Sequence, residues 1–88
     1  MGAAEQGAAE QGAIARVLAL AVLTEVAIGE RVVVRALVGE GAQDALGDLV
    51  ARTPDTVTID TRRGLVAVAL ADVVAAKRVP PPPAPRPR

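Results

Sequence analysis

The chain of 88 residues has no cysteine, no histidine, no serine and no aromatic residue. Without cysteine it has no disulfide and no zinc–thiolate site, a composition that fits a reducing, cytoplasmic compartment. Without histidine, serine and cysteine, the usual pairs of a nucleophile and its base cannot be assembled, and threonine has no histidine to activate it. We therefore expect no catalytic, cofactor-binding or metal-binding residue, and we expect that the chain is not an enzyme.

The missing aromatic residues also limit the hydrophobic core. Aromatic side chains contribute most to packing, so this core has to be built from alanine, valine, leucine and isoleucine. A domain of this length buries only about 60% of the surface that its unfolded chain exposes, which makes it marginally stable. Packing against a partner or against a second copy, as in a homodimer, is then the expected source of additional stability.

Charge is balanced over the whole chain but not along it. Residues 1–60 carry nine acidic and four basic side chains, whereas residues 61–88 carry six basic and one acidic side chain. A net charge of zero and the lack of any aromatic residue for base stacking weigh against a dedicated nucleic-acid-binding protein. Four basic residues are nevertheless candidates for contact with phosphate in a small nucleic-acid-binding barrel: Arg62, Arg63, Lys77 and Arg78.

Both ends of the chain differ in composition from its middle. Residues 1–12 repeat a Gly-Ala-Ala-Glu-Gln unit, whose glycines work against a helix, and they predict a disordered leader without the basic segment of a secretory signal. Residues 80–88 are proline-rich and predict an extended polyproline tail that acts as a semi-rigid linker. Lys77, Pro80 and Pro83 also match the motif of proline-rich peptides that bind aromatic grooves, a weaker alternative for the tail.

Residues 13–28 are apolar nearly all round and are ambiguous between a short helix and a lead-in strand. The apolar part between Arg16 and Glu25 is too short to span a membrane, which needs about 20 apolar residues. We therefore expect no membrane association and an apolar surface that is covered by protein. As a helix, the segment presents a candidate self-association surface: Ile14, Val17, Leu18 and Val22.

The middle of the chain alternates as β-strands separated by turn residues. Thr56–Thr61 sets Val57 and Ile59 against polar residues, and the turn that follows ends at Gly64, which is free to take a positive φ. Gly47 predicts a bulge or a corner within another strand. The remaining predicted strands are Arg31–Val38, Asp44–Arg52, Leu65–Leu70 and Val74–Val79, with a loop at Gly39–Gln43 and a tight turn at Ala71–Val73.

Five short strands with short connections predict a mainly β fold. The expected architecture is a small five-stranded SH3-like barrel over residues 29–79, with a short N-terminal helix and a polyproline C-terminal tail. An open sheet sealed by the N-terminal helix is the alternative.

Asp44 and Asp48 lie on one face of a predicted strand, where carboxylates are far more often surface charges than a cation site.

Four segments of the chain carry a likeness to a known family: Gly29–Arg35, Asp44–Leu49, Thr61–Gly64 and Leu70–Pro80. Together they resemble an N-terminal SH3-like barrel domain that precedes the catalytic domain in a group of actinobacterial GNAT-type N-acetyltransferases. The resemblance covers about residues 29–80, and the run from Asp72 to Pro80 is its most specific part.

The resemblance implies an accessory barrel, because in that family acetyl-CoA is bound by the domain that follows. The coenzyme-binding pattern Gln/Arg-x-x-Gly-x-Gly/Ala occurs nowhere in this chain, so no catalytic or coenzyme-binding residue is carried over. The leading hypothesis is a non-catalytic, cytoplasmic protein–protein interaction module for an acetyltransferase domain, in cis or in trans. The alternatives are the nucleic-acid-binding barrel and a self-assembling structural module held by the surface at Ile14–Leu23.

Overall fold

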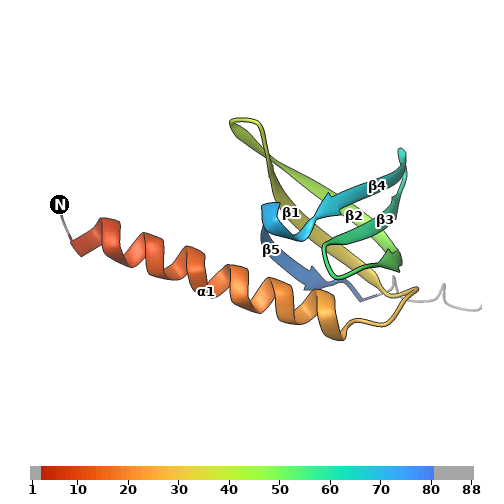
Figure 1. Cartoon of the computed structure of the whole chain (residues 1–88), viewed down its shortest axis with the longest axis horizontal. Helices are drawn as coiled ribbons and strands as arrows, with labels where there is room; N and C mark the ends of the chain where they lie inside the picture. The colour runs from red at the N-terminus through yellow and green to blue at the C-terminus, as the bar shows by residue number, and fades with distance from the viewer. Residues whose placement is uncertain (1–2, 81–88) are drawn as a thin grey trace, which may run out of the picture.

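The computed structural model describes residues 3–80, with side chains from residue 11 onward. Within these residues, one helix precedes five antiparallel strands and a short 3₁₀ turn (Figure 1). The expectation of a mainly β fold with an N-terminal helix is confirmed, while the tail expected beyond Pro80 lies outside the described residues. The elements are α1 (Ala3–Glu25), β1 (Arg31–Val38), β2 (Gly41–Arg52), β3 (Thr56–Thr61), β4 (Gly64–Ala69), η1 (Leu70–Asp72) and β5 (Val73–Arg78).

Helix α1 begins at Ala3, in the segment where the sequence predicted a disordered leader. Alanine, glutamate and glutamine are strong helix formers, and each glycine costs only about 1 kcal/mol relative to alanine. The apolar residues from Ala13 onward continue the same helix, so Gly7 and Gly12 lie inside it and do not end it. The structure therefore differs from the prediction over residues 3–12.

The same helix resolves the ambiguity of residues 13–28 in favour of a helix that ends at Glu25. The Val26 N–H still donates to the Val22 carbonyl at 2.9 Å, which extends the helical hydrogen-bond pattern by one residue. A short turn then leads into β1. The lead-in strand, the other interpretation of this segment, is wrong because these backbone groups bond within the helix.

The strand positions mostly follow the sequence pattern, and β1 and β3 match it at both ends. The main difference is β2, which begins at Gly41 because the chain reverses in a two-residue turn, Gly39-Glu40, and not in a longer loop. Gly39 has a φ of 59°, which a type II′ hairpin turn requires at its first central position. β4 and β5 each begin slightly earlier than predicted, since Gly64 already pairs with Thr61 and η1 precedes β5 directly.

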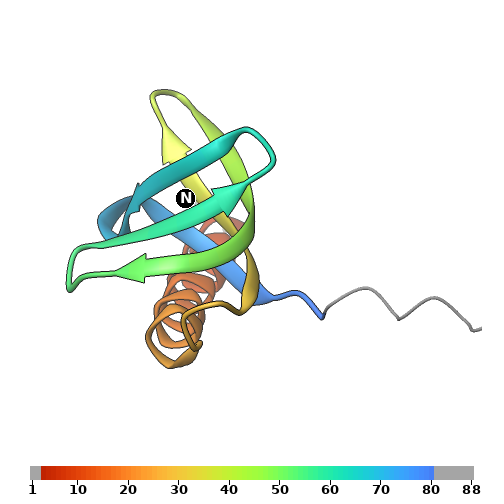
Figure 2. The same cartoon turned by 90° about the vertical axis from the view of Figure 1, so that its right-hand side faces the viewer.

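All five strands form one antiparallel sheet in the order β4-β3-β2-β1-β5. Because β1 lies between β2 and β5, the last strand returns beside the first, and the sheet curves round (Figure 2). β4 and β5 are its edges, and they do not pair with each other in the described part of the chain. The sheet is therefore unclosed, with α1 packed on it, which is the arrangement that the open-sheet alternative described.

Every strand contributes inner-face side chains to a single core, and α1 supplies the rest. In β1, for example, Val32, Val34 and Ala36 point inward and alternate with more exposed residues. All buried side chains among the described residues are hydrophobic and aliphatic. The core consists of Ala19, Leu23, Val26, Val32, Val34, Ala36, Ala45, Leu49, Val57, Ile59, Val68 and Val73.

Gly47 of β2 is the residue at which the sequence predicted a bulge or corner. The register between β2 and β3 shifts between Leu49 and Ala51 instead. What Gly47 provides is room for β3: a Cβ atom here would collide with the carbonyl group of Asp60, 2.7 Å from its carbon, and would lie 3.2 Å from Ile59 Cγ2. The two strands therefore approach too closely for any side chain at this position.

We expect Gly47→Ala to lower the free energy of unfolding by about 2–4 kcal/mol, because backbone has to move to admit the methyl group. Gly41→Ala is the matched control in the same strand, since its nearest atom would be the Val38 carbonyl oxygen at 4.0 Å. Urea denaturation of both variants measures the difference. Equal stability of the two variants would contradict the close approach of β3 to β2.

Candidate interaction surfaces

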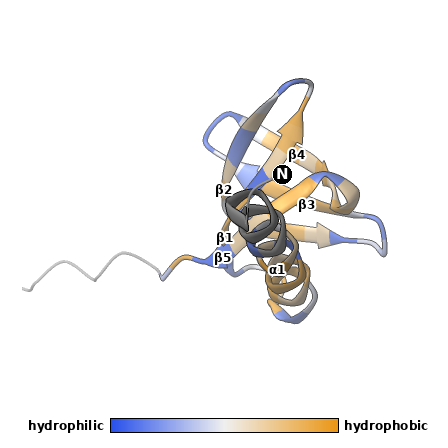
Figure 3. Ribbon diagram, turned by 90° about the vertical axis from the view of Figure 1, so that its left-hand side faces the viewer, coloured by the Kyte–Doolittle hydropathy of each residue, from blue (hydrophilic) through white to orange (hydrophobic). Residues whose placement is uncertain are grey.

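Helix α1 packs on the sheet along one stripe. Ala19 and Leu23 of the helix and Val26, directly after its end, are buried, and their spacing of three and four places them on one face, within the common core. The strand that α1 packs along is β5 (Figure 1). Hydrophobic residues run along α1 as well as along the strands (Figure 3). The helix therefore covers one side of the open sheet.

Two arginine side chains fix the helix at the two ends of this contact. Arg52 of β2 donates hydrogen bonds from one guanidinium nitrogen to the carbonyl oxygens of Leu23 at 2.9 Å and Val26 at 2.6 Å. Carbonyls in the last turn of a helix lack helical partners, and the helix dipole favours a positive charge there. Arg16 donates from the helix to the Ala71 carbonyl in η1 at 2.8 Å. Both contacts determine which face of α1 is turned outward.

The outward face of α1 carries large apolar side chains. Ile14, Val17 and Leu18 are 59%, 66% and 59% exposed, and we call these three residues the helix stripe. With 3.6 residues per turn, they lie on the side of the helix opposite to Leu23. Val22, the fourth residue expected on this surface, is half-buried at its margin. Three of the four residues that the sequence pattern grouped together are therefore exposed in the structure.

A groove of about 790 Å³ opens between the β1–β2 hairpin and the β3–β4 hairpin. Its lining includes Ala36, Ala45 and Val68, small inner residues that leave the space unfilled. A concave surface of this size and apolar character is within the range of ligand-binding sites. The groove contains no histidine, cysteine or serine, and its one hydroxyl side chain, that of Thr61, has no histidine beside it to activate it.

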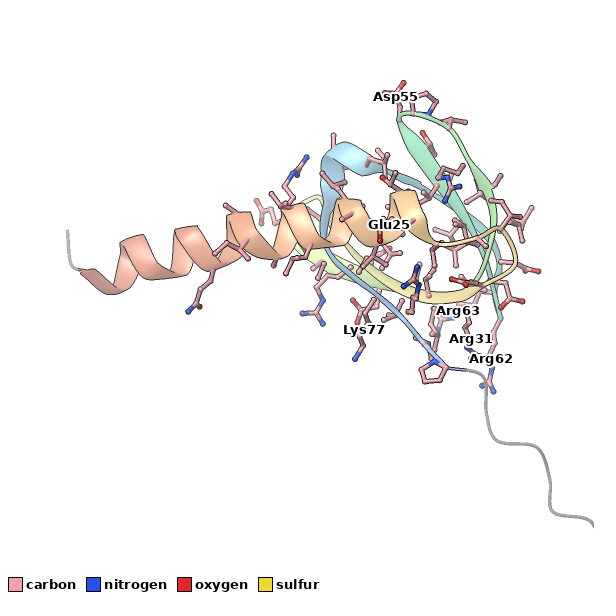
Figure 4. The ribbon with its side chains drawn as sticks, turned by 90° about the horizontal axis from the view of Figure 1, so that it is seen from below. Glu25, Arg31, Asp55, Arg62, Arg63 and Lys77 are labelled. Carbon is pink, nitrogen blue, oxygen red and sulfur yellow. The ribbon has the colours of Figure 1, made fainter. Side chains whose placement is uncertain are left out.

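The rim of this groove carries both signs of charge. Arg62 and Arg63 form the exposed turn between β3 and β4, and Arg31 begins β1; all three line the groove and lie at one end of the sheet in Figure 4. Asp44 and Asp72 line the groove as well. Three arginines against two aspartates make the rim weakly positive, which is different from a strongly basic channel.

The other two basic residues singled out from the sequence lie elsewhere. Lys77 and Arg78 are exposed near the end of β5 and do not line the groove. Arg78 Nε is 3.3 Å from a carboxylate oxygen of Glu30, and both side chains are about half exposed. The structure therefore brings Arg62 and Arg63 together with Arg31 but does not gather all four predicted residues into one surface.

An ion pair joins Arg35 of β1 to Asp44 of β2, with hydrogen bonds of 2.9 Å and 3.3 Å. The hydrogen bond from Arg35 lowers the pKa of Asp44 below its ordinary value of 3.8. Because folding lowers the pKa of Asp44, the ion pair stabilises the fold fully at pH values above the ordinary pKa of 3.8. This contribution is lost as the pH falls through the lower pKa of the folded state. The pair is exposed, so the contribution is small.

Within the described residues, no group of three carboxylates gathers as a metal site.

Sequence reasoning did not find the roles of Arg16, Arg31 and Arg52. The partners of Arg16 and Arg52 are backbone carbonyls far along the chain, and Arg31 joins a groove made by two separate hairpins. No local pattern marks such contacts. The one available signal was that Arg16 interrupts an otherwise apolar segment, which indicates a polar partner nearby.

Comparison of the chain with family models, with curated proteins and with solved structures found no match. Within residues 3–80, no helix combines the length and the hydropathy needed to cross a membrane. The function therefore has to be inferred from the surfaces described above.

We expect Arg52→Met to lower the free energy of unfolding by about 1–2 kcal/mol, because the carbonyls of Leu23 and Val26 lose a charged donor. Arg63→Met is the matched control, since Arg63 is exposed at a turn and its side chain makes no hydrogen bond within the described residues. Thermal unfolding followed by circular dichroism measures both. Equal midpoints would show that Arg52 does not hold the end of the helix.

Proposed function

We propose that this chain is a non-catalytic interaction domain, a small SH3-like barrel left open between β4 and β5, whose helix stripe docks onto a larger globular partner. The observation that carries the proposal is the exposure of Ile14, Val17 and Leu18 on the face of α1 opposite to its buried face. A helix packed on a sheet usually turns polar side chains to solvent, so an apolar outer face indicates a second contact.

The SH3-like description is supported by the strand order. β1 pairs with both β2 and β5, and inner residues from all five strands share one core. Only pairing of β4 with β5 separates this sheet from a closed five-stranded barrel. An accessory module of this kind acts by packing and positioning, in keeping with a chain that has none of the usual pairs of nucleophile and base.

The partner favoured by the sequence resemblance is a GNAT-type acetyltransferase domain, either in the same polypeptide after the proline-rich residues 80–88 or as a separate chain. A few large side chains at the centre of an interface usually carry most of its binding energy. The helix stripe has that composition and is held in place by the anchoring contacts of Arg16 and Arg52. It therefore offers a rigid, preformed surface, which lowers the entropic cost of binding.

The test is a calorimetric titration of this chain into a GNAT-type catalytic domain of the resembling family, prepared without its own N-terminal barrel. We expect micromolar binding by the wild-type chain. Leu18→Glu should weaken it at least about tenfold, because a carboxylate would be buried in the interface without a partner. Leu18 is 59% exposed in the free chain, so the substitution should leave the thermal midpoint nearly unchanged.

Ile28→Glu is the matched control, since Ile28 is 55% exposed but lies in the turn after α1 and outside the helix stripe. This variant should bind as the wild-type chain does. Absence of binding by the wild-type chain would rule out this partner. An equal loss in both variants would show that the helix stripe is not the contact surface.

A nucleic-acid-binding function has one favourable observation, the presence of Arg31, Arg62 and Arg63 on the groove rim. It requires binding of a single-stranded oligonucleotide whose affinity falls steeply with salt, and a shallower salt dependence in the Arg62→Gln/Arg63→Gln double variant. We expect fluorescence anisotropy to show no binding above about 50 mM salt, because Asp44 and Asp72 share the rim and no aromatic residue can stack on a base. Salt-dependent binding that these two arginines control would favour the alternative.

A further inference from the structure

The two edges of the open sheet differ in how they are protected. β5 carries Lys77 and Arg78, is followed by Pro80 and packs against α1. Charges, proline and a covering helix are the features with which proteins prevent a further strand from pairing. β4 has no charged residue and no proline, and β3 is its only strand partner among residues 3–80. The edge at β4 is therefore open to another strand.

The hydrogen-bond pattern of β4 identifies which peptide groups face this open edge. Gly64 pairs with Thr61 across the two-residue turn, and such a closing pair exchanges both of its backbone hydrogen bonds. The Leu70 N–H donates to the Asp55 carbonyl at 2.8 Å, which continues the same alternation beyond the end of the strand. The even-numbered residues of β4 therefore bond to β3, and the odd-numbered residues turn their peptide groups outward.

The outward peptide groups belong to Leu65, Ala67 and Ala69. All three side chains are exposed, and that of Leu65 is 69% exposed, the highest value among the large hydrophobic residues described. An N–H and a carbonyl from each residue are thus presented along the edge, with apolar side chains beside them. This is the donor–acceptor pattern that an added antiparallel strand requires.

We infer that a second copy of this chain occupies this edge. The β4 strands of the two copies pair antiparallel about a two-fold axis at Ala67, so that one sheet continues into the other. This register gives the largest overlap of the outward peptide groups and forms about six backbone hydrogen bonds between the copies. The inference is independent of the helix stripe and of the partner proposed for it.

The side chains of β4 are complementary to themselves in this register. Leu65 lies opposite Ala69 of the second copy, so the largest side chain of the edge meets a small one. On the inner face, Val66 lies opposite Val68 of the second copy, a pair of β-branched residues of the kind that stabilises adjacent strands. No like charges oppose each other, because the strand carries none.

Charges at the ends of the strand fit the same register. Arg62 precedes β4 and Asp72 follows it, and both are exposed. Antiparallel pairing centred on Ala67 brings Arg62 of one copy to the end at which Asp72 of the other lies, and symmetry repeats the contact. A strand from an unrelated protein would need its own acidic residue at that distance from an uncharged segment, whereas a second copy supplies it.

Sedimentation equilibrium from about 10 μM to 1 mM tests the inference. We expect a reversible dimer with twice the 8.9 kDa mass of the chain. Ala67→Pro should weaken the dimer at least about a hundredfold, because proline removes an outward N–H and places its ring at the edge. The N–H that it removes does not bond to β3, so the circular dichroism spectrum of the monomer should be retained.

Ala67→Lys serves as a second disrupting variant, whether or not the proline variant folds, since it sets two lysines opposite each other at the two-fold axis. Ala51→Lys is its control, because Ala51 is exposed in β2, pairs with Thr58 of β3 and lies away from the β4 edge, and should leave the dimer intact. Arg62→Asp should weaken the dimer about tenfold at low salt, and the exchange Arg62→Asp/Asp72→Arg should restore it.

A wild-type chain that stays monomeric at 1 mM would overturn the inference. So would a dimer that survives both Ala67 variants but is lost in Leu18→Glu, because that result would assign self-association to the helix stripe. Retention of the dimer in Leu18→Glu supports pairing at β4. A failure of this inference is therefore distinguishable from a failure of the helix stripe to bind its partner.

Discussion

Helix α1 packs over an entirely aliphatic core that it shares with the five strands. Leu23 of the helix and Val26 just after it are 1% and 0% exposed, and they lie in one core with the inner residues of all five strands. Burial of a leucine or valine side chain stabilises a fold by roughly 1.5–3 kcal/mol, a substantial part of the stability of a domain of this size. The helix is therefore an integral part of the domain, although the alternation of apolar and polar residues in the sequence belongs to the strands.

A shortage of large side chains accompanies four features of the structure. Gly47 lets β3 approach β2 closely, and Ala36 and Ala45 leave a groove between the hairpins unfilled. Nothing from the strands covers the outer face of α1, so the helix stripe remains exposed. β4 ends the sheet without a further partner in the described residues. A core made of small residues thus leaves several surfaces on which another protein or a second copy can complete the packing.

The sequence was most informative where the structure is local. Alternation of apolar and polar residues located β1 and β3 at both ends, and Gly64 has the positive φ of 112° that its place after a turn predicted. The length of α1 was underestimated, because glycine propensity alone does not outweigh a long run of good helix formers. Closure of the sheet depends on whether β4 meets β5, a long-range pairing that no local pattern encodes.

For the candidate surfaces too, the sequence predicted local features but not contacts between distant segments. The spacing of Ile14, Val17 and Leu18 identified one face of a helix, but only the packing of Leu23 established that this face points away from the sheet. Arg62 and Arg63 were recognisable as a basic turn, whereas their association with Arg31 requires the three-dimensional arrangement of two hairpins. Arg52, whose partners are backbone carbonyls far along the chain, has no recognisable signal in the sequence.

A methyl–methyl nuclear Overhauser experiment on the isotope-labelled chain shows whether one face of α1 belongs to the core while the other is free. We expect cross-peaks from Leu23 and Val26 methyl groups to methyl groups of the buried strand residues. For Ile14 and Leu18 in the monomer, we expect only contacts within the helix. Cross-peaks from Leu18 to the strands, or none from Leu23, would show that α1 does not pack on the sheet in this orientation.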